Sequence, residues 1–378
     1  MNVLYVSKAL VVAAYRDKIR ELERSVRITA VMPERWGREP VEPSPTGIPE
    51  PRRVPVWLGG RNHLHFYPGA RDWLSATEPD LVHIDEEPYS LVTLQLATLC
   101  GRRGTPFVFF AWQNLDRRLP PPFARVRASV FRRAAGAIAG TDGAAAALRR
   151  AGWDGPLAVV PQFGVDPARF RPDAHARTAT RARNGIPDDA FVVGYGGRLV
   201  IAKGVHHLVG AFARLPATDP EPHLLLIGDG AERDALHEQA QRLRVADRVH
   251  FSGHIDSSRM PDVLPALDVL VLPTIGTRTW TEQFGRILVE AMACGVPVAG
   301  SRCGEIPSVI GDAGDLFPAG DAAAMAAVLE AHRAHPQLRA ARAEAGRQRV
   351  IDSFTQRLVA DRTTAFYETL LERTAVAA

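Results

Sequence analysis

The chain has 378 residues, of which 46% are hydrophobic and 23% are charged, so it can bury large cores and is not a disordered chain. The net charge is +4, and the sequence has no basic stripe interleaved with aromatic residues. The lack of such a stripe argues against a nucleic-acid partner. Three cysteines are too few for a disulfide framework. The sequence has no apolar run of roughly 18 residues, which a membrane span needs, and no basic region at the N-terminus, which a signal peptide needs. We therefore expect a cytoplasmic protein.

Short apolar runs alternate with helical patterns along most of the chain. In the first half these runs cover residues 2–7, 26–32, 54–59, 80–85, 106–112, 135–140 and 157–162. In the second half they cover residues 191–197, 223–228, 248–253, 268–274 and 296–301, and only helical patterns follow residue 320. Near-continuous apolar strands joined by helices predict an α/β protein with parallel sheets that helices cover on both faces.

A polar segment bounded by prolines, residues 172–190, interrupts this series. Its composition predicts a domain boundary, with doubly wound parallel sheets before and after it. Ligands of such sheets bind outside the carboxyl ends of the strands, so we expect the ligand cleft between the two domains.

The segment EQFGRILVEAMACGVPVAG, residues 282–300, places Glu282 and Glu290 around a predicted helix that ends at Cys294. Gly295 suits the position just after a helix, and the helix N-terminus offers amides and a positive dipole end to an anion such as phosphate. Carboxylates beside a phosphate should instead contact hydroxyls, such as those of ribose or a sugar. The structural alternative is a solvated glutamate on the outer face of the helix.

Two further segments place glycines and cations directly after predicted strands. In GYGGRLVIAKG, Arg198 can fork two phosphate oxygens, and Lys203 supplies a mobile positive charge. In LLLIGDGAERDAL, Gly228 and Asp229 form a second loop of this kind. Taken alone, each cation is more often a surface residue, but the two together, after a strand and beside glycines, favour a phosphate site. A simple turn is the alternative for the second loop.

These three segments, followed by SRCGEIPSVIGDAG at 301–314, resemble the retaining family-4 glycosyltransferases of the GT-B fold. PQFGVDPARFRP at 161–172 is similar to that family's interdomain passage, and residues 250–274 are similar to its segment around the nucleotide base. The resemblance covers most of the chain and implies two Rossmann-like domains facing across a cleft. It implies an acceptor domain at 1–172, joined by a C-terminal helix at 356–378 that packs back on it, and a nucleotide-sugar domain at 173–355.

The resemblance implies a retaining, metal-independent hexosyltransferase with a UDP- or GDP-linked donor and no cofactor. The acceptor would be a hydroxyl of a glycan, a lipid-linked molecule or a small molecule. Arg198 and Lys203 would neutralise the diphosphate, where the sequence offers no Asp-x-Asp motif for a metal, and Glu282 would contact the donor sugar. The implied donor-binding residues are Gly197, Arg198, Lys203, Gly228, His254, Ile255, Glu282, Gln283, Phe284, Gly285, Arg286 and Glu290, with Arg198, Lys203 and Glu282 as the catalytic ones.

The N-terminal half departs from the family pattern in the loop at 7–18 and after the run at 106–112, where the usual histidine is missing. An acidic loop, which includes Asp85, follows the run at 80–85, and one of its carboxylates could contact the acceptor or act as a general base. Packing or loop capping is the alternative for each of these side chains. The candidate acceptor-binding residues are Lys8, Glu86, Glu87, Trp112, Gln113 and Asn114.

The stretch DRRLPPPFARVRASVFRRAAG, residues 116–136, carries six arginines among apolar residues. On a helix these arginines form a basic amphipathic face, which favours peripheral contact with an anionic membrane at its inner, cytoplasmic surface. A solvated helix face is the alternative.

Two other classes of function stay open at this point. The first is a nucleotide-sugar epimerase or phosphorylase on the same fold; an epimerase needs no second substrate, and a phosphorylase requires free phosphate. The second is a non-catalytic nucleotide-sugar-binding subunit, against which the presence of Arg198, Lys203, Glu282 and Glu290 argues.

Overall fold

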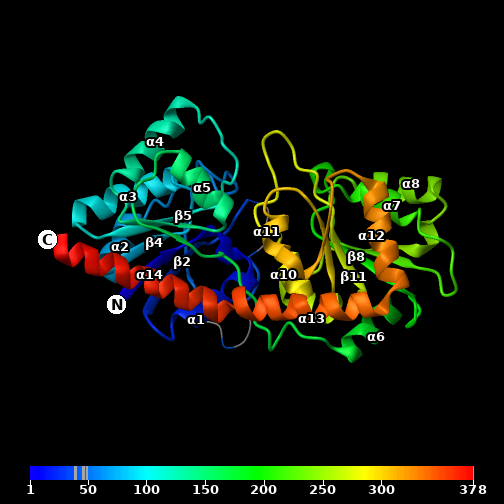
Figure 1. The fold of residues 1–378 in the computed structure, drawn as a ribbon. Helices are drawn as coiled ribbons and strands as arrows, with labels where there is room; N and C mark the ends of the chain where they lie inside the picture. Colours follow the sequence, from blue (N-terminus) through cyan, green and yellow to red (C-terminus); the bar gives the residue numbers. More distant parts are fainter. Residues whose placement is uncertain (38–40, 45–46, 48–49, 378) are drawn as a thin grey trace. The chain divides into compact units, whose positions relative to one another are not determined.

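The computed structural model describes residues 1–37, 41–44, 47 and 50–377, which form two α/β units (Figure 1). The first unit comprises Met1–Gly164 and Gln356–Ala378, and the second comprises Val165–Thr355. Residues 165–172, expected at the end of the first domain, group with the second unit. The backbone gives the reason, because the Val165 N–H donates to the Phe354 carbonyl at 2.9 Å.

The first unit is built on a seven-stranded sheet in the order β3-β2-β1-β4-β5-β6-β7, and all of its strand pairs are parallel. Its strands are β1 (Asn2–Val6), β2 (Arg27–Pro33), β3 (Arg52–Val54), β4 (Leu81–Ile84), β5 (Phe107–Ala111), β6 (Gly136–Ala139) and β7 (Leu157–Val159). Its α-helices are α1 (Asp17–Leu22), α2 (Ala70–Thr77), α3 (Leu91–Arg103), α4 (Pro121–Phe131), α5 (Asp142–Arg150) and α14 (Gln356–Ala377).

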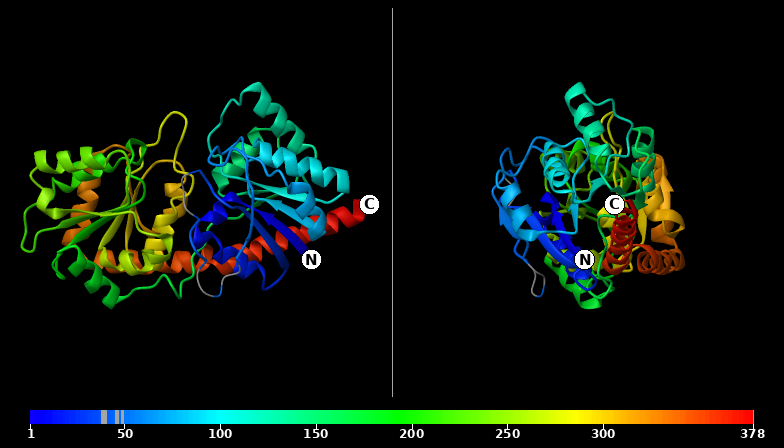
Figure 2. Two further views of the ribbon diagram at one scale, coloured as in Figure 1. Left: turned by 180° about the vertical axis from the view of Figure 1, so that it is seen from behind. Right: turned by 90° about the vertical axis from the view of Figure 1, so that its left-hand side faces the viewer.

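Successive residues of each strand point to opposite faces of this sheet and so supply two cores. Leu4, Val82 and Phe109 face one core, in which side chains of α2–α5 also lie. Val3 and Val108 face the other core, which α1 and α14 cover. Figure 2 shows α14 in red beside this sheet, to which it contributes Val359, Tyr367 and Leu370. The C-terminal helix is therefore part of the first unit.

The second unit has a six-stranded parallel sheet in the order β10-β9-β8-β11-β12-β13. Its strands are β8 (Val192–Gly196), β9 (His223–Ile227), β10 (Val249–Gly253), β11 (Val269–Leu272), β12 (Val298–Ser301) and β13 (Asp315–Phe317). Its α-helices are α6 (Ala174–Arg183), α7 (Val205–Phe212), α8 (Arg233–Arg242), α9 (Met260–Val263), α10 (Arg286–Ala293), α11 (Ile306–Ile310), α12 (Ala322–Ala334) and α13 (Pro336–Ser353). The two doubly wound parallel sheets confirm the predicted fold class.

The predicted strands and the structure differ at two places. The run at 54–59 does not form a strand along its length: β3 ends at Val54, and Trp57 makes only an isolated antiparallel bridge to Phe66. The edge strand β13 is absent from the predictions, because its three residues are too few to show a hydrophobic period.

The helix predicted within 282–300 is confirmed. It is α10, with Cys294 as its C-cap and with Gly295 in the left-handed region at a φ of 70°. A glycine at this position stops the helix without steric cost and turns the chain into β12.

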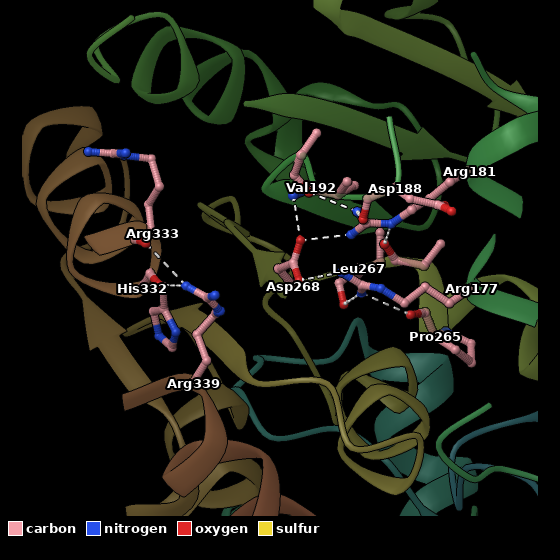
Figure 3. Close-up of polar contacts among 12 residues, drawn as sticks. Arg177, Arg181, Asp188, Val192, Pro265, Leu267, Asp268, His332, Arg333 and Arg339 are labelled. Atoms are coloured by element: carbon pink, nitrogen blue, oxygen red, sulfur yellow. Dashed lines mark hydrogen bonds and ion pairs between the residues drawn. The ribbon is translucent and has the colours of Figure 1, made fainter. Parts of the chain in front are cut away.

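A charge cluster around the buried Arg181 fastens α6 to the sheet of the second unit, as Figure 3 shows. Asp268 accepts hydrogen bonds from Arg177, Arg181 and the Val192 N–H, each at 2.8 Å. The Arg181 side chain is completely buried and also donates to four backbone carbonyls, those of Ala266, Pro187, Asp188 and Ala190. Its charge is thus compensated and its donors are used, which a buried guanidinium requires.

No helix in the part of the chain that the structure describes is both long enough and apolar enough to cross a membrane.

Candidate functional site

The candidate donor site lies on loops that follow the carboxyl ends of β8, β9 and β11 in the second unit. β8 lies between β9 and β11, so the order of the strands reverses at this point of the sheet. Ligands of doubly wound sheets bind at such switch points. Arg198 and Lys203 follow β8, Gly228 follows β9, and Glu282 and α10 follow β11.

The loops after β8 and β9 pack backbone against backbone. The Gly197 N–H donates to the Ile227 carbonyl, and the Leu199 N–H donates to the Asp229 carbonyl, both at 2.9 Å. Gly228 has a φ of 136°, and a Cβ on it would lie only 1.9 Å from the Gly197 carbonyl oxygen. Only glycine allows this approach. The loop that carries Arg198 and Lys203 is therefore held in place by its neighbour.

Lys203 and Glu282 form an ion pair at the centre of the site. The Lys203 Nζ lies 2.6 Å from Glu282 Oε2, which also accepts a hydrogen bond from Thr274 Oγ1 at 2.9 Å. The ammonium lies 4.9 Å from the centroid of the Trp280 ring, within cation–π range. Only 7% of Glu282 is exposed. The structure thus brings together two of the three predicted catalytic residues.

Arg198, the third of them, is exposed, and its carbonyl accepts hydrogen bonds from the Tyr195 hydroxyl at 2.8 Å and from the Val200 N–H at 3.1 Å. Among the described residues, no carboxylate forms an ion pair with its guanidinium. This side chain is available to an anion that reaches the loop.

Arg286 and Glu290 form a second pair, at 2.8 Å, one turn apart at the start of α10. Glu290 is only 2% exposed, so the alternative of a solvated glutamate is wrong. Desolvation raises the pKa of the Glu290 carboxyl, and Arg286 and Arg169 act against that rise. Gly285, with a φ of 82°, is the N-cap of the helix.

The other predicted donor-binding residues lie in different surroundings. Gln283 is half-buried, whereas Phe284 is buried and packs edge-on against Phe354, with ring centroids 5.8 Å apart. His254 and Ile255 follow the edge strand β10 and line a separate cavity of about 330 Å³. The described contacts do not join them to Lys203 or Glu282.

The predicted acceptor residues lie in the first unit, at the carboxyl ends of β1, β4 and β5. Lys8 and the buried Glu86 form an ion pair. His65 and Trp36, which were not predicted as site residues, complete this cluster. The His65 Nε2 lies 3.5 Å from Glu86 Oε1, and the centroid of the Trp36 ring lies 5.5 Å from the Lys8 Nζ. Neither belongs to a recognisable motif, so only the folded chain reveals them.

The three carboxylates of the acidic loop have different partners. Asp85 is buried and accepts hydrogen bonds from Ser7, Tyr5 and Gln162, so it holds the ends of strands together. Glu86 pairs with Lys8 as described. Glu87 Oε1 accepts hydrogen bonds from the N–H groups of Trp112 and Gln113 at 2.8 and 2.9 Å, which fixes the loop after β5.

That loop contains the remaining acceptor candidates. The Trp112 ring stacks on Phe163 with centroids 5.1 Å apart, so at least one face of the ring packs against protein. Asn114 is half-buried in the same loop, and Gln113 Oε1 accepts from the Leu115 N–H at 3.1 Å.

A cavity of about 550 Å³ opens beside this loop, and we call it the arginine pocket. Its polar lining is formed by Glu87, Tyr89, Gln113, Arg117, Arg118, Arg127 and Arg150, together with Asp116. Tyr89 and Arg150 were not predicted as site residues. The signals in the sequence that pointed toward this region were the acceptor candidates Glu87 and Gln113 and the cluster of arginines at 116–136.

The expectation of one basic helix along 116–136 needs correction. The helix α4 spans only Pro121–Phe131 and carries two of the six arginines, Arg125 and Arg127. The reason is the run Pro120–Pro122, which favours extended backbone before the helix and provides proline at its first positions.

Glu87 is expected to make the stability of the protein depend on pH. Desolvation raises its pKa from 4.5 to about 7, although the N–H groups of Trp112 and Gln113 act against that rise. Since the folded state then holds the proton more tightly than the unfolded state, Glu87 favours folding below pH 4.5, and this stabilisation is lost as the pH rises through about 7. The Glu87→Gln variant should therefore gain up to about 3 kcal/mol relative to the parent between pH 5 and pH 8.

Denaturant unfolding at the two pH values measures this gain, with the exposed Glu368→Gln as the matched control. A difference between Glu87→Gln and the parent that stays constant with pH would contradict the assignment.

Two family models match the chain. The second unit matches the model of the glycosyl transferases group 1 over residues 176–349. The first unit matches that of the glycosyl transferase 4-like domain over residues 11–162.

Curated relatives support these matches. The lipopolysaccharide core biosynthesis glycosyltransferase LpsE of Rhizobium meliloti is 32% identical over 275 residues, which cover 69% of this chain and 75% of that protein. A D-inositol 3-phosphate glycosyltransferase of Stackebrandtia nassauensis is 37% identical over 158 residues, which cover 39% of this chain and 34% of the relative. The chain thus spans only about a third of the second relative's length.

Among solved structures, the Anabaena protein HepE in complex with UDP superposes with a TM-score of 0.77. It is 21% identical, and the match covers 98% of this chain and 100% of that chain. This likeness confirms the GT-B fold.

Proposed function

We infer the function from one premise, which is that this chain belongs to the glycosyl transferases group 1 family. The chain is a glycosyltransferase of the GT-B fold. We propose that it moves a hexosyl group from a UDP- or GDP-linked sugar to a hydroxyl of a glycan, a lipid-linked molecule or a small molecule. We further propose that the transfer retains the anomeric configuration and needs neither a metal nor a cofactor. The UDP complex of HepE and the lipopolysaccharide role in the name of LpsE support this choice of donor and acceptor classes.

The observation that carries the proposal is the ion pair between Lys203 and Glu282 ahead of the N-terminus of α10. A nucleotide diphosphate leaves the sugar with growing negative charge, and a fixed ammonium stabilises that charge most strongly in the transition state. When the donor binds, Lys203 exchanges the Glu282 carboxylate for the diphosphate. Glu282 is then released to accept hydrogen bonds from the sugar hydroxyls.

The residues around this pair complete the proposed donor site. Arg198, which is exposed on the glycine-rich loop, takes a second position on the diphosphate. The first amides of α10 add their dipole. Glu290 accepts hydrogen bonds from the ribose hydroxyls while Arg286 holds its carboxylate in place.

Retention follows in this proposal from attack on the face that the diphosphate leaves. The bond between the anomeric carbon and the phosphate oxygen breaks while the bond to the acceptor oxygen forms, and the acceptor proton passes to the leaving phosphate oxygen. The protein then needs no nucleophile of its own, and Lys203 and Arg198 stabilise the departing charge in place of a metal.

The test begins with a panel of UDP- and GDP-hexoses, of which the true donor should raise the melting temperature by mass action. Turnover is then measured with candidate acceptors, with and without EDTA, and the product's anomeric configuration is determined by NMR. We expect a retained configuration and unchanged activity in EDTA.

Other outcomes would support the competing functions. Interconversion of the donor sugar without an acceptor indicates an epimerase, and a requirement for free phosphate indicates a phosphorylase. Binding without turnover indicates a non-catalytic subunit. A product of inverted configuration contradicts retention. A loss of activity in EDTA that Mg²⁺ restores contradicts metal independence.

A cytoplasmic location with peripheral contact to an anionic membrane through residues 116–136 remains part of the proposal. It is supported by the exposed Arg132 and Arg133, which follow α4. Failure of the purified protein to pellet with anionic vesicles at low salt would contradict it.

A further inference from the structure

We propose that the arginine pocket of the first unit binds a phosphate-ester group of the acceptor. This inference rests on the proposed function, because it narrows the acceptor from any hydroxyl compound to one that carries a phosphate. The pocket lies wholly within the first unit and shares no residue with the donor site.

The first observation is an excess of positive charge in the lining of the pocket. Arg150 is compensated, because its Nε donates to both carboxylate oxygens of Asp116 at 2.8 Å. For Arg117, Arg118 and Arg127, the described residues provide no ion-pair partner. Glu87 is the other acid in the lining, and with a pKa of about 7 it carries only part of a negative charge at neutral pH.

The second observation is that these arginines line the same cavity as a buried polar side chain, that of Tyr89. Burial raises the pKa of the Tyr89 hydroxyl, as does the charge of Glu87, whereas the charges of Arg117 and Arg127 act against that rise. Arg117, Arg127 and Tyr89 line the same cavity, and the Tyr89 hydroxyl also contacts the side chain of Gln113. A phosphate at this place would accept hydrogen bonds from planar guanidinium forks, whose geometry matches its oxygens.

The third observation concerns size and the apolar part of the wall. The cavity of about 550 Å³ is much larger than a single phosphate and is of the size that small organic ligands fill. Leu115, Leu119 and Leu148 line it beside the arginines. This combination suits a phosphate ester on a carbon skeleton, such as a phosphorylated sugar or polyol.

The phosphate ester has two possible sources, a soluble metabolite or the headgroup of a lipid. A variant of Arg125 distinguishes binding in the pocket from binding to a charged surface, because Arg125 lies on α4 with Arg127 but does not line the cavity. Arg117→Gln/Arg127→Gln is therefore the test variant, and Arg125→Gln is its matched control.

The full chain is titrated with glycerol 3-phosphate and with glycerol in the presence of saturating UDP, so that the donor site does not capture the phosphate. Thermal stabilisation gives the concentration for half-maximal binding. A parallel arm measures pelleting with vesicles of phosphatidylglycerol and of phosphatidylcholine.

We expect glycerol 3-phosphate to bind at least tenfold more tightly than glycerol, Arg117→Gln/Arg127→Gln to lose at least tenfold, and Arg125→Gln to retain parental binding. Binding only to phosphatidylglycerol vesicles, weakened more by the double variant than by Arg125→Gln, supports the pocket with a lipid source. No phosphate-dependent binding in either arm, or equal losses in the double variant and Arg125→Gln, overturns the proposal. Stabilisation by UDP alone, measured in the same variants, tests the proposed donor site separately.

Discussion

Replacing Lys203 with alanine is expected to lower kcat by about 10²–10³-fold, the cost of removing one fixed group that stabilises charge in a transition state. The expected effect on kcat is large for two reasons. The loop that carries Lys203 is held by the contact between Gly197 and Gly228, and its ammonium lies 2.6 Å from Glu282, which we propose to contact the donor sugar. The effect should appear in kcat as well as in kcat/KM, since the diphosphate gains charge as the bond breaks. Steady-state kinetics with the donor identified from the panel measures it.

Loss of stability must be separated from loss of catalysis in this experiment. Lys203→Ala removes the ammonium that pairs with the buried Glu282 carboxylate, so the single variant should also unfold more easily. The double variant Lys203→Ala/Glu282→Gln also removes the carboxylate charge and should regain stability but not activity. Arg242→Ala, at an exposed ion pair on α8, is the matched control and should keep parental kcat. Parental kcat in a folded Lys203→Ala protein would contradict the assigned role.

Replacing Asp268 with alanine is expected to destabilise the second unit by about 3–5 kcal/mol, the usual cost of breaking a buried ion pair by removing one partner. The variant leaves the charge of the fully buried Arg181 uncompensated and removes the acceptor for the Val192 N–H (Figure 3). Asp268→Asn keeps the shape and part of the hydrogen bonding, so its loss should be smaller. Urea denaturation measures both.

The control for this prediction is Asp247→Ala, an exposed aspartate of the same unit, which should change stability by less than about 0.5 kcal/mol. The two units can unfold in separate transitions, so hydrogen exchange in β8 and β11 identifies the transition of the second unit. A loss below about 1 kcal/mol in Asp268→Ala would show that Arg181 finds another partner, against the assignment of Asp268 as its anchor.

The amino-acid sequence by itself determined the features that depend on neighbouring residues. The strand runs with their intervening helical patterns predicted two parallel sheets. Gly295 predicted the end of α10, and the order of glycines, cations and glutamates after successive strands placed the candidate donor residues at one edge of a sheet. These signals are local, because periodicity and helix caps extend over only a few residues.

Tertiary structure alone decided which of these residues meet. Lys203 and Glu282 are 79 positions apart and form a pair, whereas His254 lies at a separate cavity. The partial charge of Glu87 and the arginine pocket around it also arise only when the loops after β4 and β5 come together. The physical reason is that burial and long-range pairing set the electrostatics of a site, and both depend on chain segments that no local pattern connects.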